Sequence, residues 1–129
     1  MLFLYHVIIL IITIFSPIII FYRVLKNKED KKRYIEKFSI SSKKRLKGKL
    51  IWFHGASVGE ILSIVPLIRN YEKNRSIAQI LITSSTLSSS KVLHKFKFKK
   101  TVHQFYPIDH FFFTSKFLRF WKPSIAIFI

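Results

Sequence analysis

Ser57 and Glu60, three residues apart, are the residues whose types and spacing could do chemistry. They lie in the segment Gly55-Ala-Ser-Val-Gly-Glu60, directly after a short apolar run. A carboxylate at such a turn could act as a general base that takes a proton from a substrate hydroxyl. The same spacing fits a capping box, in which Glu60 only binds the backbone N–H of Ser57. The spacing by itself leaves both interpretations open.

Small and hydroxyl-bearing residues surround this pair. Gly55 and Gly59 could let a substrate approach the backbone at the positive end of a helix, or they could be turn glycines. Ser57 could orient a phosphate or cap the helix. Thr83 and Ser84 follow a second apolar run, and they could bind sugar or phosphate or cap the next helix. Each of these residues therefore has a binding interpretation and a structural one.

Apolar runs that alternate with helical stripes would position these residues. The pattern predicts strands over residues 50–54, 79–83, 102–106 and 124–129, the first two of them buried. It predicts helices over residues 57–71, 89–96 and 110–121. Pro66 predicts a kink near residues 62–66, and Asp109 could cap the last helix. Such alternation indicates an α/β fold with a parallel sheet, whose binding sites gather at the carboxyl ends of the strands.

An apolar segment without charged residues occupies positions 2–22. As a helix it would rise about 31 Å, close to the thickness of a bilayer core. It lacks the basic start and the small-residue cleavage site of a signal peptide. A core helix with no polar face does not suit so small a chain. We predict a membrane anchor helix over residues 1–22, which either spans the bilayer or enters one leaflet.

Positive charge begins directly after this segment, with Arg23, Lys26 and Lys28. Because positive flanks stay on the cytoplasmic side, we expect a protein of the cell inner membrane whose globular part is cytoplasmic. Residues 23–49 form a basic connector that would also attract anionic lipid. Within it, residues 27–38 could form a short surface helix or a solvated linker, and residues 39–49 resemble an exposed loop.

Composition excludes several classes of protein and site. Half of the 129 residues are apolar, which is too many for a disordered chain, and the absence of Cys excludes disulfides, iron–sulfur clusters and thiol catalysis. The five His residues show no metal-ligand spacing, so we predict no metal and no cofactor. The net charge is +17, and residues 95–100 alternate Lys with Phe, a pattern that can stack nucleobases. We prefer inward-packed Phe and solvated Lys, and we predict no nucleic-acid partner.

The segment Trp52-Phe-His-Gly-Ala-Ser-Val-Gly-Glu60 resembles the W-x-H-x-x-S-V-G-E motif of the bacterial 3-deoxy-D-manno-octulosonic acid (Kdo) transferases. Further segments resemble the family in the same order: Pro66-Leu67, Thr83-Ser84-Ser85-Thr86, Tyr106-Pro107-Ile108-Asp109, and Phe117-Leu118 with Pro123. Residues 87–90 depart from the family's T-P-T-G continuation, and the chain ends before its E-T-E-x-W-P-N segment.

The resemblance implies the N-terminal, Rossmann-like half of a glycosyltransferase with two such domains (GT-B architecture). Residues 50–129 would be a partial acceptor-side domain, truncated at the C-terminus. The implied reaction transfers Kdo from CMP-Kdo, held by a missing C-terminal domain, to a lipid A precursor in lipopolysaccharide core biosynthesis. Glu60 would be the general base, and substrate would be bound by Gly55, Ser57, Gly59, Thr83 and Ser84. The alternative is a noncatalytic, membrane-anchored truncated module that binds anionic lipid or a partner.

Overall fold

A parallel sheet forms the centre of the computed structural model, which describes residues 1–129. Its strands are β1 (Lys49–His54), β2 (Ile77–Ser84), β3 (Thr101–Phe105) and β4 (Ile125–Phe128). They lie in the order β3-β2-β1-β4, and every neighbouring pair is parallel. The predicted α/β fold with a parallel sheet is therefore confirmed. The strand order reverses between β1 and β4, and ligands of such folds bind outside the carboxyl ends of the strands at this point.

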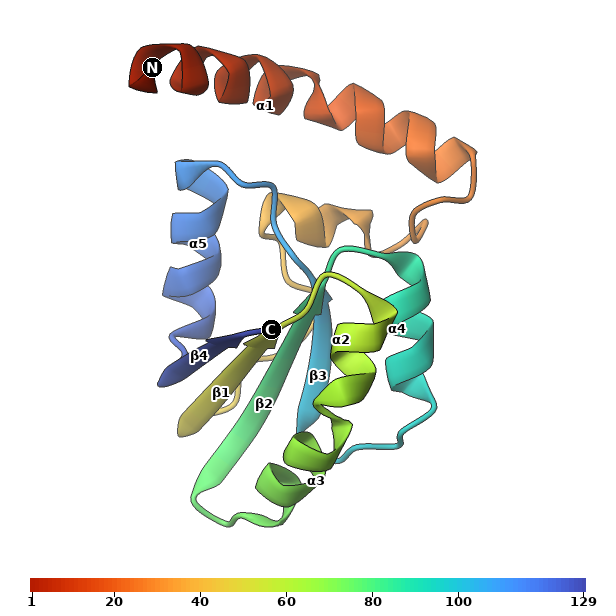
Figure 1. Cartoon of the computed structure of the whole chain (residues 1–129), viewed down its shortest axis with the longest axis vertical. Coiled ribbons are helices and arrows are strands. Elements are labelled where there is room, and N and C mark those ends of the chain that lie inside the picture. The colour runs from red at the N-terminus through yellow and green to blue at the C-terminus, as the bar shows by residue number, and fades with distance from the viewer.

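Helices cover both faces of the sheet (Figure 1). They are α2 (Val58–Ser63), α3 (Val65–Lys73), α4 (Leu87–His94) and α5 (Phe111–Trp121). On one face Ile51 and Phe53 of β1 join a core with residues of α2, α3 and α4. On the other face Leu50 and Trp52 pack against α5. Side chains of a strand alternate between faces, so β1 supplies both cores.

The helix predicted over residues 57–71 is two helices with a break between them. α2 ends at Ser63, and Ile64 separates it from α3. Pro66 lies in the first turn of α3, where a missing N–H leaves no helical hydrogen bond unmade. The expected irregularity near residues 62–66 is confirmed. The break limits α2 to six residues, and Glu60 lies in its first turn.

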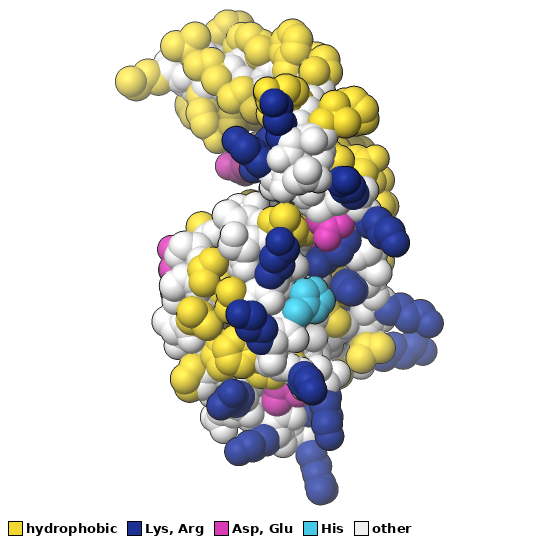
Figure 2. Space-filling model, turned by 90° about the vertical axis from the view of Figure 1, so that its right-hand side faces the viewer, with side chains coloured by type: hydrophobic (Ala, Val, Ile, Leu, Met, Phe, Trp, Pro, Cys, Tyr) yellow, Lys and Arg dark blue, Asp and Glu magenta, His cyan; other side chains and the backbone are white.

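The apolar leader forms one long helix, α1 (Leu2–Leu25), which runs three residues beyond the predicted end. Pro17 does not break it: the Ser16 hydroxyl donates to the Thr13 carbonyl at 2.7 Å, and this is the carbonyl that Pro17 cannot serve. Only 11% of the most apolar 18-residue stretch of α1 is buried, so α1 is not a core helix of the α/β body. Figure 2 shows hydrophobic side chains covering α1, while many Lys and Arg side chains project from the body below it.

The connector does not behave as a solvated linker throughout. A short 3₁₀ helix, η1 (Tyr34–Phe38), packs on the body with Glu36 fully buried. The Phe38 ring lies 5.7 Å from that of Phe113 in α5. The solvated alternative is wrong for this segment, because its carboxylate has partners inside the fold. Residues 39–49 do form a largely exposed loop, as expected.

Candidate active site

The turn between β1 and α2 holds Glu60 at the carboxyl end of β1. Gly55 starts the turn, and its N–H donates to the Thr83 carbonyl at 3.1 Å. A Cβ at Gly55 would meet the Ile61 Cδ1 at 3.0 Å and the Glu60 Cβ at 3.3 Å, so this glycine has a packing reason. A Cβ at Gly59 would meet only the Ser57 Oγ, at 4.0 Å. The fold therefore requires Gly55 but not Gly59.

The predicted capping box is present in the structure. The Glu60 N–H donates to the Ser57 Oγ at 3.2 Å, while the Glu60 Oε2 accepts from the N–H groups of Ala56 at 2.7 Å and Ser57 at 3.5 Å. The Ala56 N–H bond, together with the Ser57 side chain, holds the pKa of the Glu60 carboxyl below its usual value. Both backbone N–H groups that bind the carboxylate do so through Oε2, and Oε1 has no hydrogen bond in the protein. The box and a general base are compatible, because one oxygen anchors the carboxylate and the other is left for a substrate.

Thr83 and Ser84 are fully buried, and their hydroxyls face into the protein. The Thr83 Oγ1 contacts the Trp52 Nε1 at 2.8 Å and the His54 Nδ1 at 2.9 Å. The Ser84 Oγ lies 2.8 Å from the His103 Nε2. Neither residue caps α4. That role belongs to Thr86, whose hydroxyl accepts from the Ser89 N–H at 3.3 Å, and α4 therefore starts two residues earlier than predicted.

A second cap also differs from the sequence-based expectation. Asp109 does not cap α5. His110 does, by accepting from the Phe112 N–H through its Nδ1 at 3.2 Å. Asp109 is exposed and has no capping role at the start of α5.

A buried polar network that sequence reasoning missed lies beside β3. Arg33 of the connector binds both oxygens of Glu36 at 2.9 Å, and its Nη2 also contacts the His103 Nδ1 at 3.0 Å. Glu36 in turn accepts the Phe105 N–H at 2.9 Å. Burial, with the adjacent Arg33 charge, lowers the pKa of His103 to about 3, so this ring is neutral. No short motif signals the network, because Arg33 and His103 are 70 positions apart.

Aromatic rings wall the carboxyl end of β1. The His54 ring lies 4.3 Å from that of Tyr106 and 5.6 Å from that of Phe128, at the end of β4. Burial lowers the pKa of His54 and raises that of Tyr106, so both groups are neutral near pH 7. Glu60 and His54 therefore both lie near the carboxyl end of β1, where the strand order reverses.

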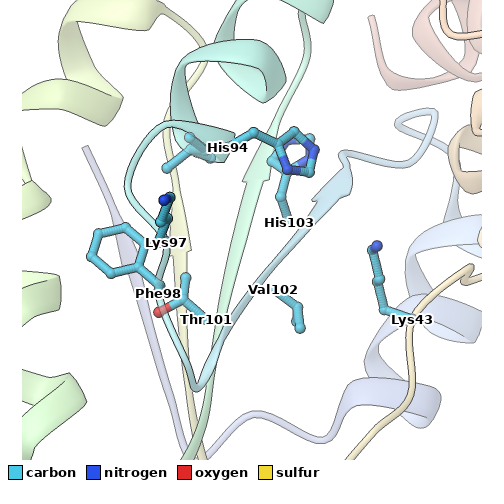
Figure 3. A pocket seen from close by; sticks show the side chains of 8 residues that line it. Lys43, His94, Lys97, Phe98, Thr101, Val102 and His103 are labelled. Atoms are coloured by element: carbon cyan, nitrogen blue, oxygen red, sulfur yellow. The ribbon is translucent and has the colours of Figure 1, made fainter.

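A separate cavity of about 170 Å³ lies along β3 and holds none of the predicted site residues. Lys43 reaches it from the connector, His94 and Lys97 from the end of α4 and the loop that follows, and Val102 from β3 (Figure 3). Phe98 also lines it and packs on the core beneath α4. The inward packing preferred for residues 95–100 is therefore seen for Phe98.

Comparison with known proteins points to one family. Residues 31–129 match the family model described as 3-deoxy-D-manno-octulosonic-acid transferase (kdotransferase). The chain is 43% identical over 112 residues to the 3-deoxy-D-manno-octulosonic acid transferase of Rickettsia bellii, covering 87% of this chain and 27% of that protein. It is 36% identical over 115 residues to a probable mitochondrial transferase of the same name from Arabidopsis thaliana, covering 87% of this chain and 26% of the relative. The chain thus spans about a quarter of these relatives. No solved structure gives a significant match.

Proposed function

Because the chain belongs to the 3-deoxy-D-manno-octulosonic acid (Kdo) transferase family, we propose that it supplies the acceptor side of a Kdo transferase. The acceptor is a lipid A precursor, the donor is CMP-Kdo, and the pathway is lipopolysaccharide core assembly. The α/β body is one half of a GT-B architecture, whose second domain binds the donor. The observation that carries this proposal is the Glu60 carboxylate, anchored through Oε2 with Oε1 unpartnered at the strand-order reversal.

Glu60 acts as the general base of the transfer. Its free oxygen takes the proton from an acceptor hydroxyl as that oxygen attacks the anomeric carbon of the donor. The new carbon–oxygen bond forms while the bond to CMP breaks, and CMP leaves with the electron pair. The lowered pKa of Glu60 keeps the carboxylate ionised at neutral pH, so the base is in its proton-accepting form, and the transfer depends on the geometry of the site rather than on a raised basicity.

The remaining predicted residues fall into two groups: those at the turn, which the acceptor can approach, and those that support the site from inside the protein. Gly59 has open space where a Cβ would stand, although glycine in a helix is less stable than alanine by about 0.5–1 kcal/mol. This favours close approach of the acceptor at Gly59, with Gly55 and Ser57 shaping the same turn. Thr83 and Ser84 support the site from inside, because their hydroxyls are already bound to Trp52, His54 and His103.

A chimera tests the proposal directly. The chain replaces the segment that it matches in the Rickettsia bellii transferase, and we expect the purified chimera to transfer Kdo from CMP-Kdo to a lipid A precursor. A chimera that carries the unrelated apolar leader of another protein in place of the whole chain is the negative control. A folded chimera that binds anionic vesicles but transfers no Kdo would contradict the proposal and favour the noncatalytic module.

The membrane location belongs to the same proposal. α1 is long and apolar enough to cross a bilayer, and Arg23 lies in its last turn. An anchor of this kind keeps the body next to an acceptor whose lipid part stays in the membrane. With the basic flank on the cytoplasmic side, the body faces the cytoplasm at the inner membrane.

Deleting residues 2–22 should release the chain from washed membranes, because it removes the apolar surface that α1 exposes. Added protease should digest the body of the intact chain in inside-out vesicles but not in intact spheroplasts. Sedimentation of the deleted chain with membranes at the wild-type level would show that α1 is not the anchor. Digestion in spheroplasts would show that the orientation is reversed.

A further inference from the structure

Three side chains form a hydrogen-bonded relay that ends at the candidate active site. The Trp52 Nε1 lies 2.8 Å from the Thr83 Oγ1, which lies 2.9 Å from the His54 Nδ1. Thr83 is fully buried and Trp52 is nearly so, whereas His54 is half-buried at the carboxyl end of β1. The relay runs from the core beneath α5 to the turn that carries Glu60.

The chemistry of the three groups fixes the direction of each hydrogen bond. An indole N–H can only donate, so the Thr83 oxygen accepts from Trp52. The Thr83 hydroxyl proton then has one partner within reach, the Nδ1 of His54. If Nδ1 carried a proton, the fully buried hydroxyl would have no acceptor, which is a costly arrangement. This arrangement favours Nδ1 as the acceptor, with the ring proton on Nε2.

The protonated Nε2 of His54 faces outward. It has no hydrogen-bond partner in the protein, and no buried side-chain nitrogen or oxygen lacks a partner, so Nε2 is reached by solvent. The ring is held between Tyr106 and Phe128 and cannot swing freely. His54 is the last residue of β1 and Glu60 lies in the first turn of α2, so both side chains start at the same edge of the sheet.

We propose that the Nε2–H of His54 donates a hydrogen bond to an oxygen of the acceptor sugar next to the hydroxyl that Glu60 deprotonates. Trp52 and Thr83 are positioning residues that hold His54 in the required tautomer. A neutral donor suits this place, since a cationic imidazole would pair with the Glu60 carboxylate and compete with the proton transfer. The inference rests on the proposed function for the identity of the substrate, but the tautomer of His54 can be tested without it.

The first test reads the tautomer in the chain itself. Nitrogen-15 NMR of the full chain in detergent micelles should show an unprotonated Nδ1 and a protonated Nε2 on His54. Thr83→Ser keeps the hydroxyl and should preserve this pattern, whereas Thr83→Val should give a mixture of tautomers. A wild-type ring with its proton on Nδ1 would overturn the inference whatever the activity of the protein.

The second test uses the active chimera. His54→Phe keeps an aromatic ring but removes the donor, and we expect kcat/KM for the acceptor to fall about ten-fold, the range of one lost hydrogen bond. His54→Gln returns an N–H donor at a similar reach and should recover most of that loss, while the KM for CMP-Kdo stays unchanged in both variants. Wild-type acceptor kinetics in a folded His54→Phe chimera would overturn the inference, and so would equal losses in the Phe and Gln variants. An inactive wild-type chimera would count against the proposed function instead.

Discussion

Replacing Glu60 with Gln is expected to slow Kdo transfer by the chimera by about 10²–10⁴-fold, the usual contribution of a general base. The variant removes the proton acceptor but keeps the size of the side chain. Its amide oxygen can still accept from the N–H groups of Ala56 and Ser57, as the Oε2 of Glu60 does. The fold should therefore survive while the chemistry is lost.

The capping box makes this substitution a sharp test. A box accepts Gln in place of Glu, so a purely structural Glu60 predicts a folded and active variant. The measurement combines initial rates of Kdo transfer with a melting curve of each protein. Glu72→Gln is the matched control, because it makes the same change at a carboxylate that binds the N–H groups of Lys99 and Lys100 outside the candidate site, and it should leave transfer unchanged. Near-normal transfer by a stable Glu60→Gln variant would refute the catalytic role and leave only the cap.

Local pattern was enough to predict the sheet and the position of Glu60. Apolar runs mark β1, β2 and β4, and all four observed strands differ from the predicted ones by at most two residues at either end. Such runs work for β1 and β2 because both faces of the sheet are covered there, whereas the edge strand β4 is apolar but largely exposed. The capping box could also be predicted from the sequence, since its two residues lie three positions apart.

Long-range contacts could not be predicted from the same pattern. Thr83 and Thr86 look alike in the sequence, yet one lies buried against Trp52 and the other caps α4. Their roles depend on which face the strand end presents, and on a tryptophan 31 positions away. His54 shows the same limit: its place at the end of β1, next to Phe128 of β4, depends on strand pairing that no local motif encodes.

The connector is the largest departure from the sequence-based expectation. A run of basic residues predicts a solvated segment, but Arg33 turns inward and ends 86% buried against Glu36 and His103. The family match begins at residue 31, close to this point, rather than at the first strand. Both observations indicate that η1 belongs to the α/β body, which gives α1 a short path to the site rather than a long flexible tether.

Replacing Glu36 with Ala should destabilise the body by about 3–5 kcal/mol, as expected when one partner of a buried ion pair is removed. The substitution leaves the Arg33 guanidinium and the Phe105 N–H without the carboxylate that each binds at 2.9 Å. The free energy of unfolding would be measured by urea denaturation of the full chain in mild detergent.

A double variant separates the buried charge from the lost packing. Arg33→Met combined with Glu36→Leu removes both charges and keeps most of the volume, so it should be more stable than Glu36→Ala alone. It should not regain the full wild-type stability, because the Phe105 N–H and the His103 carbonyl, which Arg33 contacts at 2.6 Å, still lose their partners. A loss below about 1 kcal/mol for Glu36→Ala, in the range of an exposed pair, would show that η1 is loosely attached. The anchor would then be joined to the active site by a flexible segment.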